Sequence, residues 1–287
     1  MNNDLRITFV VENTARKAGL LAEHGLSYWI ELGGHGVLFD TGQGQVLAPN
    51  AERLQIDISS ARAVVLSHGH FDHTGGLRYV FHLADQAKVF LHPQAMLPRY
   101  TLHRGQAAEI GLAALTKAEL ERERHRLVWT TQPTAIVPGI FATGAIPRIN
   151  NYEDTGGDFF LDAAGHVPDP IVDDQAIYVD TDSGVVVVLG CAHAGVVNTL
   201  EYVGKLTGRP ILAAIGGTHL VNASPERVAR TIGVLRQMGV KLVVPCHCTG
   251  PRAMAALWTA LPNQIADGCV GTHLSFPAGA VTSADPR

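Results

Sequence analysis

Short apolar runs recur along the whole chain, rich in β-branched residues and bounded by Gly, Pro or Asp. This pattern is typical of buried β-strands. The runs are LRITFVV (5–11), SYWIEL (27–32), GVLFD (36–40), AVVLS (63–67), KVFLH (88–92), IYVDT (177–181), GVVVVLG (184–190), PILAAI (210–215) and KLVVP (241–245).

Between these runs, apolar residues recur at helical spacing, which predicts helices near 76–84, 107–125, 195–206, 225–238 and 251–260. The helix at 225 has the clearest start, because Ser224 can cap it and Pro225 suits its first position. Strands alternate with helices in both halves of the chain, so the pattern predicts an α/β layered fold.

Two segments interrupt this alternation and are interpreted as insertions. In residues 100–126, the sequence KAELERERHR places Glu119/Arg122, Glu121/Arg124 and Glu123/Arg126 three residues apart. Oppositely charged residues at this spacing pair along a helix face, so we expect a solvated surface helix, with a lid or partner surface as the alternative. Residues 147–170 combine turn-forming residues with Tyr152, Phe159 and Phe160. That segment is either a loop that closes over a substrate or an anchored surface loop.

Composition and charge limit the kinds of partner that the protein can have. A content of 46% hydrophobic residues in 287 residues can form a sizeable core, and a net charge of −4 without a dense Lys/Arg block argues against a nucleic-acid partner. The N-terminal stretch lacks the pattern of a signal peptide and no apolar run approaches the roughly 20 residues of a membrane span. We therefore expect a cytoplasmic protein without a membrane partner, whose cysteines Cys191, Cys246, Cys248 and Cys269 are reduced.

The candidate chemistry is concentrated in SHGHFDHTGG (67–76), directly after the predicted strand AVVLS. His68 and His70, two residues apart, can bind one cation, and Asp72 and His73 can bind a second. Imidazole and carboxylate ligands suit zinc, manganese or iron. Further ligand types follow other predicted strands, namely Cys191, His193, His219 and His247. We interpret the lone histidines elsewhere as structural or surface residues: His35, His82, His92, His103, His125, His166 and His273.

The sequence HGHFDH resembles the HxHxDH signature of the metallo-β-lactamase superfamily, and FDTG with Asp40 resembles the strand-end aspartate that commonly precedes it. Within that superfamily the chain resembles the dihydropterin-ribofuranosylaminobenzene-phosphate synthase-like branch. The matching segments are VEN with Asn13, EHGLS (23–27), SHGHFDHTGGL, DDQA (173–176), GCAHAG (190–195), GGTHL (216–220) and HCTG (247–250). The resemblance implies one domain over residues 1–287, a four-layer αββα sandwich with a metal pair at one edge, carrying insertions at 100–126 and 147–170.

The resemblance also implies the ligand sets. One ion takes His68, His70 and His193, and the other takes Asp72, His73 and His247. Cys191 stands roughly where many members have a bridging aspartate, so it is either a ligand or a small buried neighbour, with Asp174 as a weaker substitute. Asp40 either orients a ligating histidine or forms a turn, and the resemblance favours the first.

Two divalent ions, most simply zinc, with manganese or iron as alternatives, would activate water for hydrolysis. Asp72 would hold one ion and orient the nucleophile. Asn13, His24, Ser27 and His219 offer neutral donors to a phosphate or carboxylate, so the leading hypothesis is hydrolysis of a small anionic ester, such as a phosphoester or cyclic phosphodiester. The alternatives are a synthase-like transferase and a non-enzymatic metal-binding or sensing protein. A homo-oligomer is compatible with the sequence.

Overall fold

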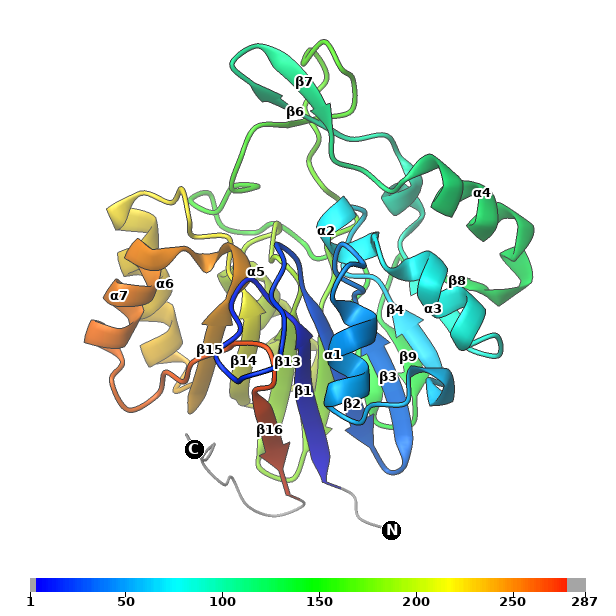
Figure 1. The fold of residues 1–287 in the computed structure, drawn as a ribbon. Coiled ribbons are helices and arrows are strands. Elements are labelled where there is room, and N and C mark those ends of the chain that lie inside the picture. Colours follow the sequence, from blue (N-terminus) through cyan, green and yellow to red (C-terminus); the bar gives the residue numbers. More distant parts are fainter. Residues whose placement is uncertain (1–3, 278–287) are drawn as a thin grey trace.

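Two facing β-sheets form the centre of the protein in a computed structural model that describes residues 4–277 (Figure 1). The first sheet has the strand order β16-β1-β2-β3-β4-β5-β8. Its strands are β1 (Leu5–Val11), β2 (Ser27–Leu32), β3 (His35–Phe39), β4 (Ala63–Val65), β5 (Lys88–Leu91), β8 (Leu127–Trp129) and β16 (His273–Phe276). From β3 to β8 neighbouring strands are parallel, so their carboxyl ends meet at one edge.

The second sheet has the order β15-β14-β13-β12-β10-β9. It consists of β9 (Thr134–Val137), β10 (Ile140–Ala142), β12 (Ile177–Thr181), β13 (Gly184–Leu189), β14 (Ile211–Gly217) and β15 (Leu242–Cys246). The neighbouring strands β13, β14 and β15 are parallel. Their carboxyl ends therefore also lie together at one edge.

The alternation of side chains along each strand builds the core between the sheets. On β1, Ile7 and Phe9 pack into the cluster between the two sheets, whereas Val10 packs on the outer side. On β13, Val186 and Val188 face the inner cluster, while alternate residues such as Val187 face the helices outside. Both faces of these strands are buried, which explains why they appear in the sequence as continuous apolar runs.

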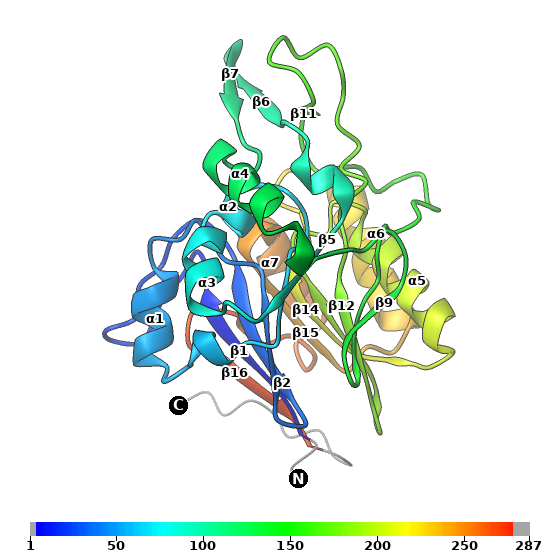
Figure 2. The same ribbon diagram turned by 90° about the vertical axis from the view of Figure 1, so that its right-hand side faces the viewer.

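Helices cover the outer face of each sheet (Figure 2). The first sheet is covered by α1 (Leu47–Arg53), α3 (Leu77–Leu83) and α4 (Ala114–Arg122), and the second by α5 (Val196–Thr207), α6 (Pro225–Gln237) and α7 (Pro251–Ala260). Short helical turns are α2 (Phe71–Thr74), η1 (Ile58–Ser60), η2 (Pro93–Met96), η3 (Arg124–Arg126) and η4 (His247–Thr249). The predicted αββα sandwich is confirmed, as is the cap of α6, where Ser224 accepts a hydrogen bond from the Arg227 amide.

The two segments that the sequence predicts to be insertions, 100–126 and 147–170, differ in part from the expected helix and loop. The predicted helix at 107–125 is wrong in its first part, because β6 (Tyr100–His103) and β7 (Gln106–Glu109) form a hairpin and the helical part begins only with α4. The hairpin pairs with β11 (Phe159–Phe160) from the second insertion, and together they rise above the sandwich as an arm (Figure 2). The remainder of 147–170 is irregular, as expected.

The solvated-helix interpretation holds for Glu121 and Arg124, which pair at 3.6 Å on the surface. It is wrong for Glu119, which is buried and pairs with Arg78 of α3 at 3.1 Å. It is also wrong for Arg126, whose buried guanidinium donates to backbone carbonyls and lies over the Phe81 ring. Both charges anchor the insertion to the first sheet's helices. Across residues 4–277, no helix is long and apolar enough to cross a membrane.

Candidate metal centre

Side chains with metal-ligand chemistry gather at the edge where the parallel strands of both sheets end. Parallel pairing brings these strand ends together although they are far apart in sequence. From the first sheet, β3 leads to Asp40 and β4 leads to the turn that carries His68, His70, Asp72 and His73; from the second, β13 leads to Cys191 and His193, β14 to His219, and β15 to His247.

His68, His70 and His193 form one compact set. One ring nitrogen from each lies within 4.8 Å of the others, and His68 Nε2 is 2.9 Å from His70 Nδ1. All three side chains are buried, and burial lowers the pKa of each imidazole well below its usual value. The rings are therefore neutral near pH 7, which is the form that binds metal ions.

The second insertion contributes directly to this set. The carbonyl of Thr155 lies 2.8 Å from His193 Nδ1 and so accepts a hydrogen bond from the Nδ1 proton, leaving Nε2 as the nitrogen with a free lone pair. The Phe159 ring lies 5.1 Å from the His70 ring and 5.3 Å from the His193 ring. Phe159 of this segment therefore lies against two of the histidines, and closure of the segment over a substrate stays a prediction.

Asp72, His73 and His247 form the adjacent set. Asp72 Oδ2 is 3.4 Å from His247 Nε2 and 3.7 Å from His73 Nε2, and the two imidazole nitrogens are 3.3 Å apart. Burial alone would raise the pKa of Asp72, but the charge of His73 and hydrogen bonds from His24 and His247 hold it well below the usual range. Asp72 is therefore an anion.

His73 lies between two carboxylates, with Asp40 Oδ2 at 2.7 Å from its Nδ1. Burial works to lower the pKa of His73, but Asp72 and Asp40 outweigh it and raise the pKa to about 9. Positive charge is thus stabilised at this position. Asp40 is fully buried behind His73 and also accepts hydrogen bonds from Ser67, so it orients the imidazole and does not face the open side of the site.

The hydrogen-bond partners of the imidazole nitrogens show whether these residues suit metal ions. Four imidazoles have Nδ1 held by an oxygen while Nε2 faces the cluster, an arrangement typical of metal-binding histidines. The buried Nε2 atoms of His70 and His193 have no hydrogen-bond partner among the described residues. The donor set therefore fits divalent ions; the oxygen contacts are Ser67 Oγ to His68 at 2.9 Å, Asp40 Oδ2 to His73 at 2.7 Å, Thr155 O to His193 at 2.8 Å and Asn13 Oδ1 to His247 at 2.9 Å.

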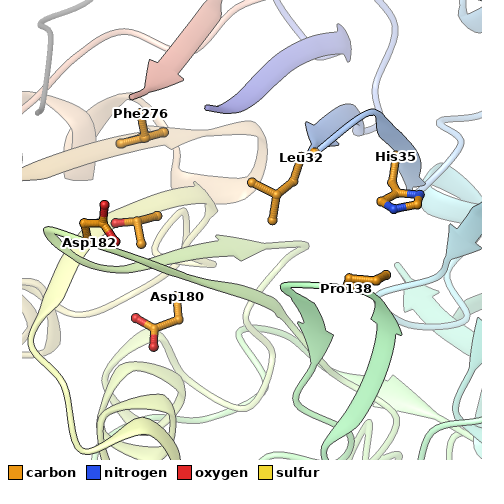
Figure 3. Close-up of a pocket in the computed structure, with 8 residues that line it drawn as sticks. Leu32, His35, Pro138, Asp180, Asp182 and Phe276 are labelled. Atoms are coloured by element: carbon orange, nitrogen blue, oxygen red, sulfur yellow. The ribbon is translucent and has the colours of Figure 1, made fainter. Parts of the chain in front are cut away.

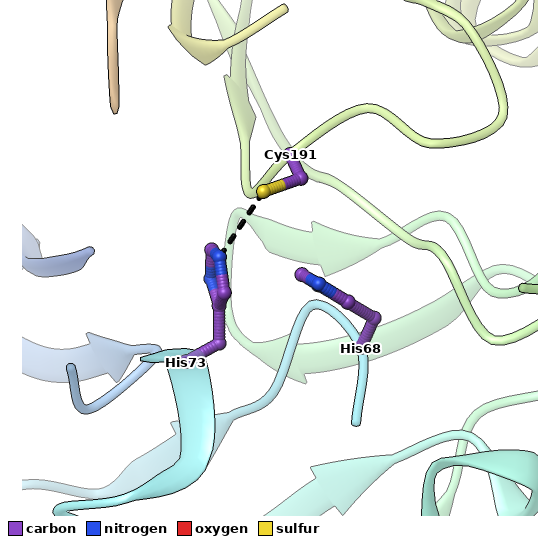
Figure 4. A group of neighbouring side chains, drawn as sticks. All are labelled: His68, His73 and Cys191. Atoms are coloured by element: carbon purple, nitrogen blue, oxygen red, sulfur yellow. Dashed lines mark hydrogen bonds between the residues drawn. The ribbon is translucent and has the colours of Figure 1, made fainter. Parts of the chain in front are cut away.

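Cys191 lies between the two sets. Its Sγ is 3.1 Å from His73 Nε2, and it forms a possible ligand group with His73 and with His68 of the other set (Figure 4). Burial raises the pKa of the Cys191 thiol well above its usual value. Asp174 instead supports the chain beside His193, because its Oδ2 accepts a hydrogen bond from the Ala194 amide at 2.7 Å. The geometry favours Cys191 over Asp174 as an additional ligand.

The four residues expected to bind substrate have different positions. His24 is exposed and lies 3.2 Å from Asp72 Oδ2, next to the His247 ring. Asn13 accepts a hydrogen bond from His247 Nδ1 and so orients a predicted ligand. His219 is buried against His193, with ring centroids 4.2 Å apart. Ser27 is a correction: it is fully buried and donates to the Asp40 carbonyl at 2.8 Å, so it faces away from any substrate.

Sequence reasoning missed a buried ion network beneath the histidine turn. Arg99 is fully buried and donates from Nε to Asp169 at 2.7 Å and from Nη1 to Asp173 at 2.8 Å. Asp173 Oδ2 also accepts from the Gly69 amide at 2.8 Å, between two predicted ligands. A Cβ on Gly69 would lie 2.4 Å from the Ala95 carbonyl, so only glycine fits there. Asp173 stood in the DDQA segment, but nothing in the sequence marked Arg99.

One cavity adjoins this cluster and another lies far from it. One of about 570 Å³ adjoins His247 and is lined by Arg16, Met254 and Trp258 among others. Another, of about 430 Å³, lies at the opposite end of the sandwich, at the turn after β2 and the turn between β12 and β13 (Figure 3). Asp180, one of the two acidic residues that line it, pairs with Arg209 at 2.7 Å. The second cavity is remote from the strand ends that carry the ligand chemistry.

Comparison with known proteins agrees with this geometry. Residues 21–247 match the family model described as the metallo-beta-lactamase superfamily. The chain is 32% identical over 243 residues to a Methanocaldococcus jannaschii protein named 7,8-dihydropterin-6-methyl-4-(beta-D-ribofuranosyl)-aminobenzene-5'-phosphate synthase, covering 81% of this chain and 83% of that protein.

Solved structures show the same fold. The structure titled as Tm1679, a metal-dependent hydrolase of the beta-lactamase superfamily, is 29% identical with a TM-score of 0.81, covering 95% of this chain and 99% of that one. A diphosphatase from the PhnP family is 14% identical with a TM-score of 0.53, covering 97% and 99%, and shares the fold. The chain belongs to the metallo-beta-lactamase superfamily, and within it resembles the dihydropterin-ribofuranosylaminobenzene-phosphate synthase branch.

Proposed function

We propose that the protein is a metal-dependent hydrolase that holds two divalent ions and acts on a small anionic ester, such as a phosphoester or cyclic phosphodiester. One observation carries the proposal. His68, His70 and His193 form one set and Asp72, His73 and His247, whose nearest ligand atoms lie within 3.7 Å of one another, form the adjacent set. Oxygen partners at Nδ1 direct Nε2 of four of these imidazoles into the cluster.

Divalent ions bound there would supply Lewis acidity and lower the pKa of a coordinated water towards neutrality. Zinc suits the imidazole, carboxylate and thiol donors, with manganese or iron as alternatives. The protein's own part is to hold its donors in fixed orientation. Asp72 is ionised and can accept a hydrogen bond that orients the attacking nucleophile, while Asp40 keeps Nε2 of His73 directed into the site.

The surroundings favour a small, negatively charged substrate. His219 has a buried Nδ1 without a partner among residues 4–277, so it can donate a hydrogen bond to a phosphoryl or carboxyl oxygen. His24 lies at the exposed side of Asp72, where its ring can contact the same group. The Phe159 ring covers His70 and limits the access of bulk water to the histidines. The cavity beside His247 offers room for the non-reacting part of a substrate.

Turnover measurements on metal-loaded protein test this function. The substrates are a phosphodiester, a lactone, and a pterin mixed with a phosphoribosyl-type donor. We expect hydrolysis of the phosphodiester, loss of that activity in His68→Ala, and no change in His125→Ala, whose side chain is exposed and remote from the centre. Metal-dependent turnover of the lactone alone would reject the anionic substrate. Binding of ions without turnover of any substrate would favour a sensing protein.

A synthase reaction is the second candidate, because the Methanocaldococcus jannaschii relative that shares 32% identity carries a synthase name. Loss of pyrophosphate from a phosphoribosyl-type donor would develop negative charge at the same donors that would stabilise a hydrolytic transition state. Product formation only when pterin and donor are both present would support this candidate over hydrolysis.

A further inference from the structure

A second cysteine, Cys248, lies beside the two ligand sets and belongs to neither. Its Sγ, the Sγ of Cys191 and a ring nitrogen of His219 all lie within 4.8 Å of one another. We propose that these three side chains form a thiolate-rich position for a thiophilic cation such as Zn²⁺ or Cu⁺, next to the two positions of the proposed hydrolytic centre. The proposal concerns binding and does not depend on which reaction the protein catalyses.

The sheet explains why these three residues meet. Strands β13, β14 and β15 are parallel neighbours and end at Leu189, Gly217 and Cys246. Each potential ligand stands two residues beyond its strand, because 189 leads to 191, 217 to 219 and 246 to 248. Parallel pairing places Gly217 opposite Cys246 and Leu189 opposite Gly216, so the three strands end within one residue of the same level and the residues that follow them meet at one edge.

The backbone at these strand ends is shaped to bring the groups together. His219 has φ of 47°, and Ala192 and His247, each next to one of the cysteines, have φ of 54° and 50°. Such values cost free energy for residues other than glycine and persist where the surrounding structure requires them, often at functional sites. Gly217 leaves the space for the second thiol, since a Cβ there would lie 2.7 Å from Cys248 Sγ.

The His219 imidazole and the Cys248 thiol can each bind a ligand. His219 is 8% exposed and its buried Nδ1 has no hydrogen-bond partner among the described residues. Cys248 Sγ accepts a hydrogen bond from the His219 amide at 3.3 Å and lies 3.5 Å from the Cys191 carbonyl, which holds the sulfur between the other two groups. A cation bound by both sulfurs and the imidazole would replace the proton of the Cys191 thiol and would occupy the buried His219 nitrogen, which then could not also donate to a substrate oxygen.

Ligand chemistry selects the class of ion. Soft thiolates favour Zn²⁺ and Cu⁺ over Mg²⁺ or Ca²⁺. Two cysteines and one histidine are a ligand set of catalytic zinc sites that keep a fourth position open. The Cys191/Cys248/His219 set has two sulfur ligands, whereas the His68/His70/His193 and Asp72/His73/His247 sets consist of imidazole and carboxylate groups. Cys191 can serve both, because its Sγ also lies 3.1 Å from His73 Nε2.

Metal binding to the full-length protein tests the proposal. Protein stripped of metal is titrated with Cd²⁺ or Co²⁺ while the thiolate-to-metal charge-transfer absorbance and the bound ion content are measured. We expect Cys248→Ser to lose one bound ion and the part of the absorbance that its thiolate contributes, with the histidine-bound ions retained. The matched control is Cys269→Ser, because Cys269 contacts only Thr272 among its hydrogen-bond partners and belongs to no ligand group of the described chain.

X-ray absorption at the zinc edge of the unmutated protein provides a measurement that does not depend on how variants fold. The proposal requires a sulfur shell at about 2.3 Å, and its absence would overturn it. An unchanged absorbance and ion content in Cys248→Ser would also overturn it, since Cys191 would then serve the adjacent pair alone and the second thiol would only pack. Neither readout uses substrate turnover, so failure of this metal-binding proposal can be distinguished from failure of the proposed hydrolase activity.

Discussion

Replacing Arg99 by methionine is the perturbation with the largest expected effect outside the ligand sets. Arg99 is fully buried between Asp169 and Asp173, whose side chains are also buried. Methionine fills similar space but removes the guanidinium, so two carboxylates remain in the interior without their charge partner. Removing one member of a buried ion pair typically destabilises a protein by about 3–5 kcal/mol.

The expected loss corresponds to a fall in Tm of roughly 6–20 °C, since 1 kcal/mol shifts Tm by about 2–4 °C in a chain of this size class. Thermal unfolding followed by circular dichroism gives the measurement. The control is Arg6→Met, because the Arg6–Glu31 pair is solvent-exposed and such pairs contribute only about 0–1 kcal/mol. Adding Asp169→Asn and Asp173→Asn to Arg99→Met should recover part of the loss by removing the unpaired charges.

The same variant should affect metal content selectively. Asp173 holds the Gly69 amide between His68 and His70, so releasing Asp173 loosens the set formed with His193 while leaving the Asp72 set in place. Elemental analysis should therefore show loss of one ion ahead of the other. A Tm within error of Arg6→Met together with full metal content would refute both the energetic and the positioning argument.

Three further outcomes follow from the geometry. His68→Ala and Asp72→Ala should each remove at least one of two bound ions, because sites with few ligands tolerate little loss; elemental analysis after reconstitution checks this, and a single ion in the unmutated protein would contradict the two-ion centre. With no cation at the Cys191/Cys248/His219 position, His219→Ala should keep the ions of His68/His70/His193 and Asp72/His73/His247 but slow turnover of an anionic ester by about 10²–10³ relative to a neutral ester. Equal effects on both esters would leave His219 without a role in charge recognition. Phe159→Ala should raise KM and leave the metal content unchanged, because the ring covers the histidines without ligating. Substrate saturation curves measure the first effect and elemental analysis the second, and loss of the ions would show that the Phe159 ring is needed for metal retention.

Local sequence patterns determined much of this protein. Nine apolar runs predicted strands that lie in the two sheets, and α7 begins and ends where its pattern predicted, at Pro251 and Ala260. These succeed because alternation and helical spacing record directly which faces of an element are buried. The HxHxDH turn could also be predicted as a metal-binding segment, since its candidate ligands lie within six positions and need no long-range contact to come together.

The tertiary structure decided what each remaining side chain can do. The strand order β15-β14-β13 and the packing of two sheets brought His193 and His247 to the histidine turn, out of 14 histidines in the chain. The same packing buried Ser27 away from the site, placed Cys248 beside Cys191, and put Arg99 under Gly69. No local pattern encodes these outcomes, because they depend on which strand ends become neighbours, and that is settled by pairing and core packing between segments far apart in the chain.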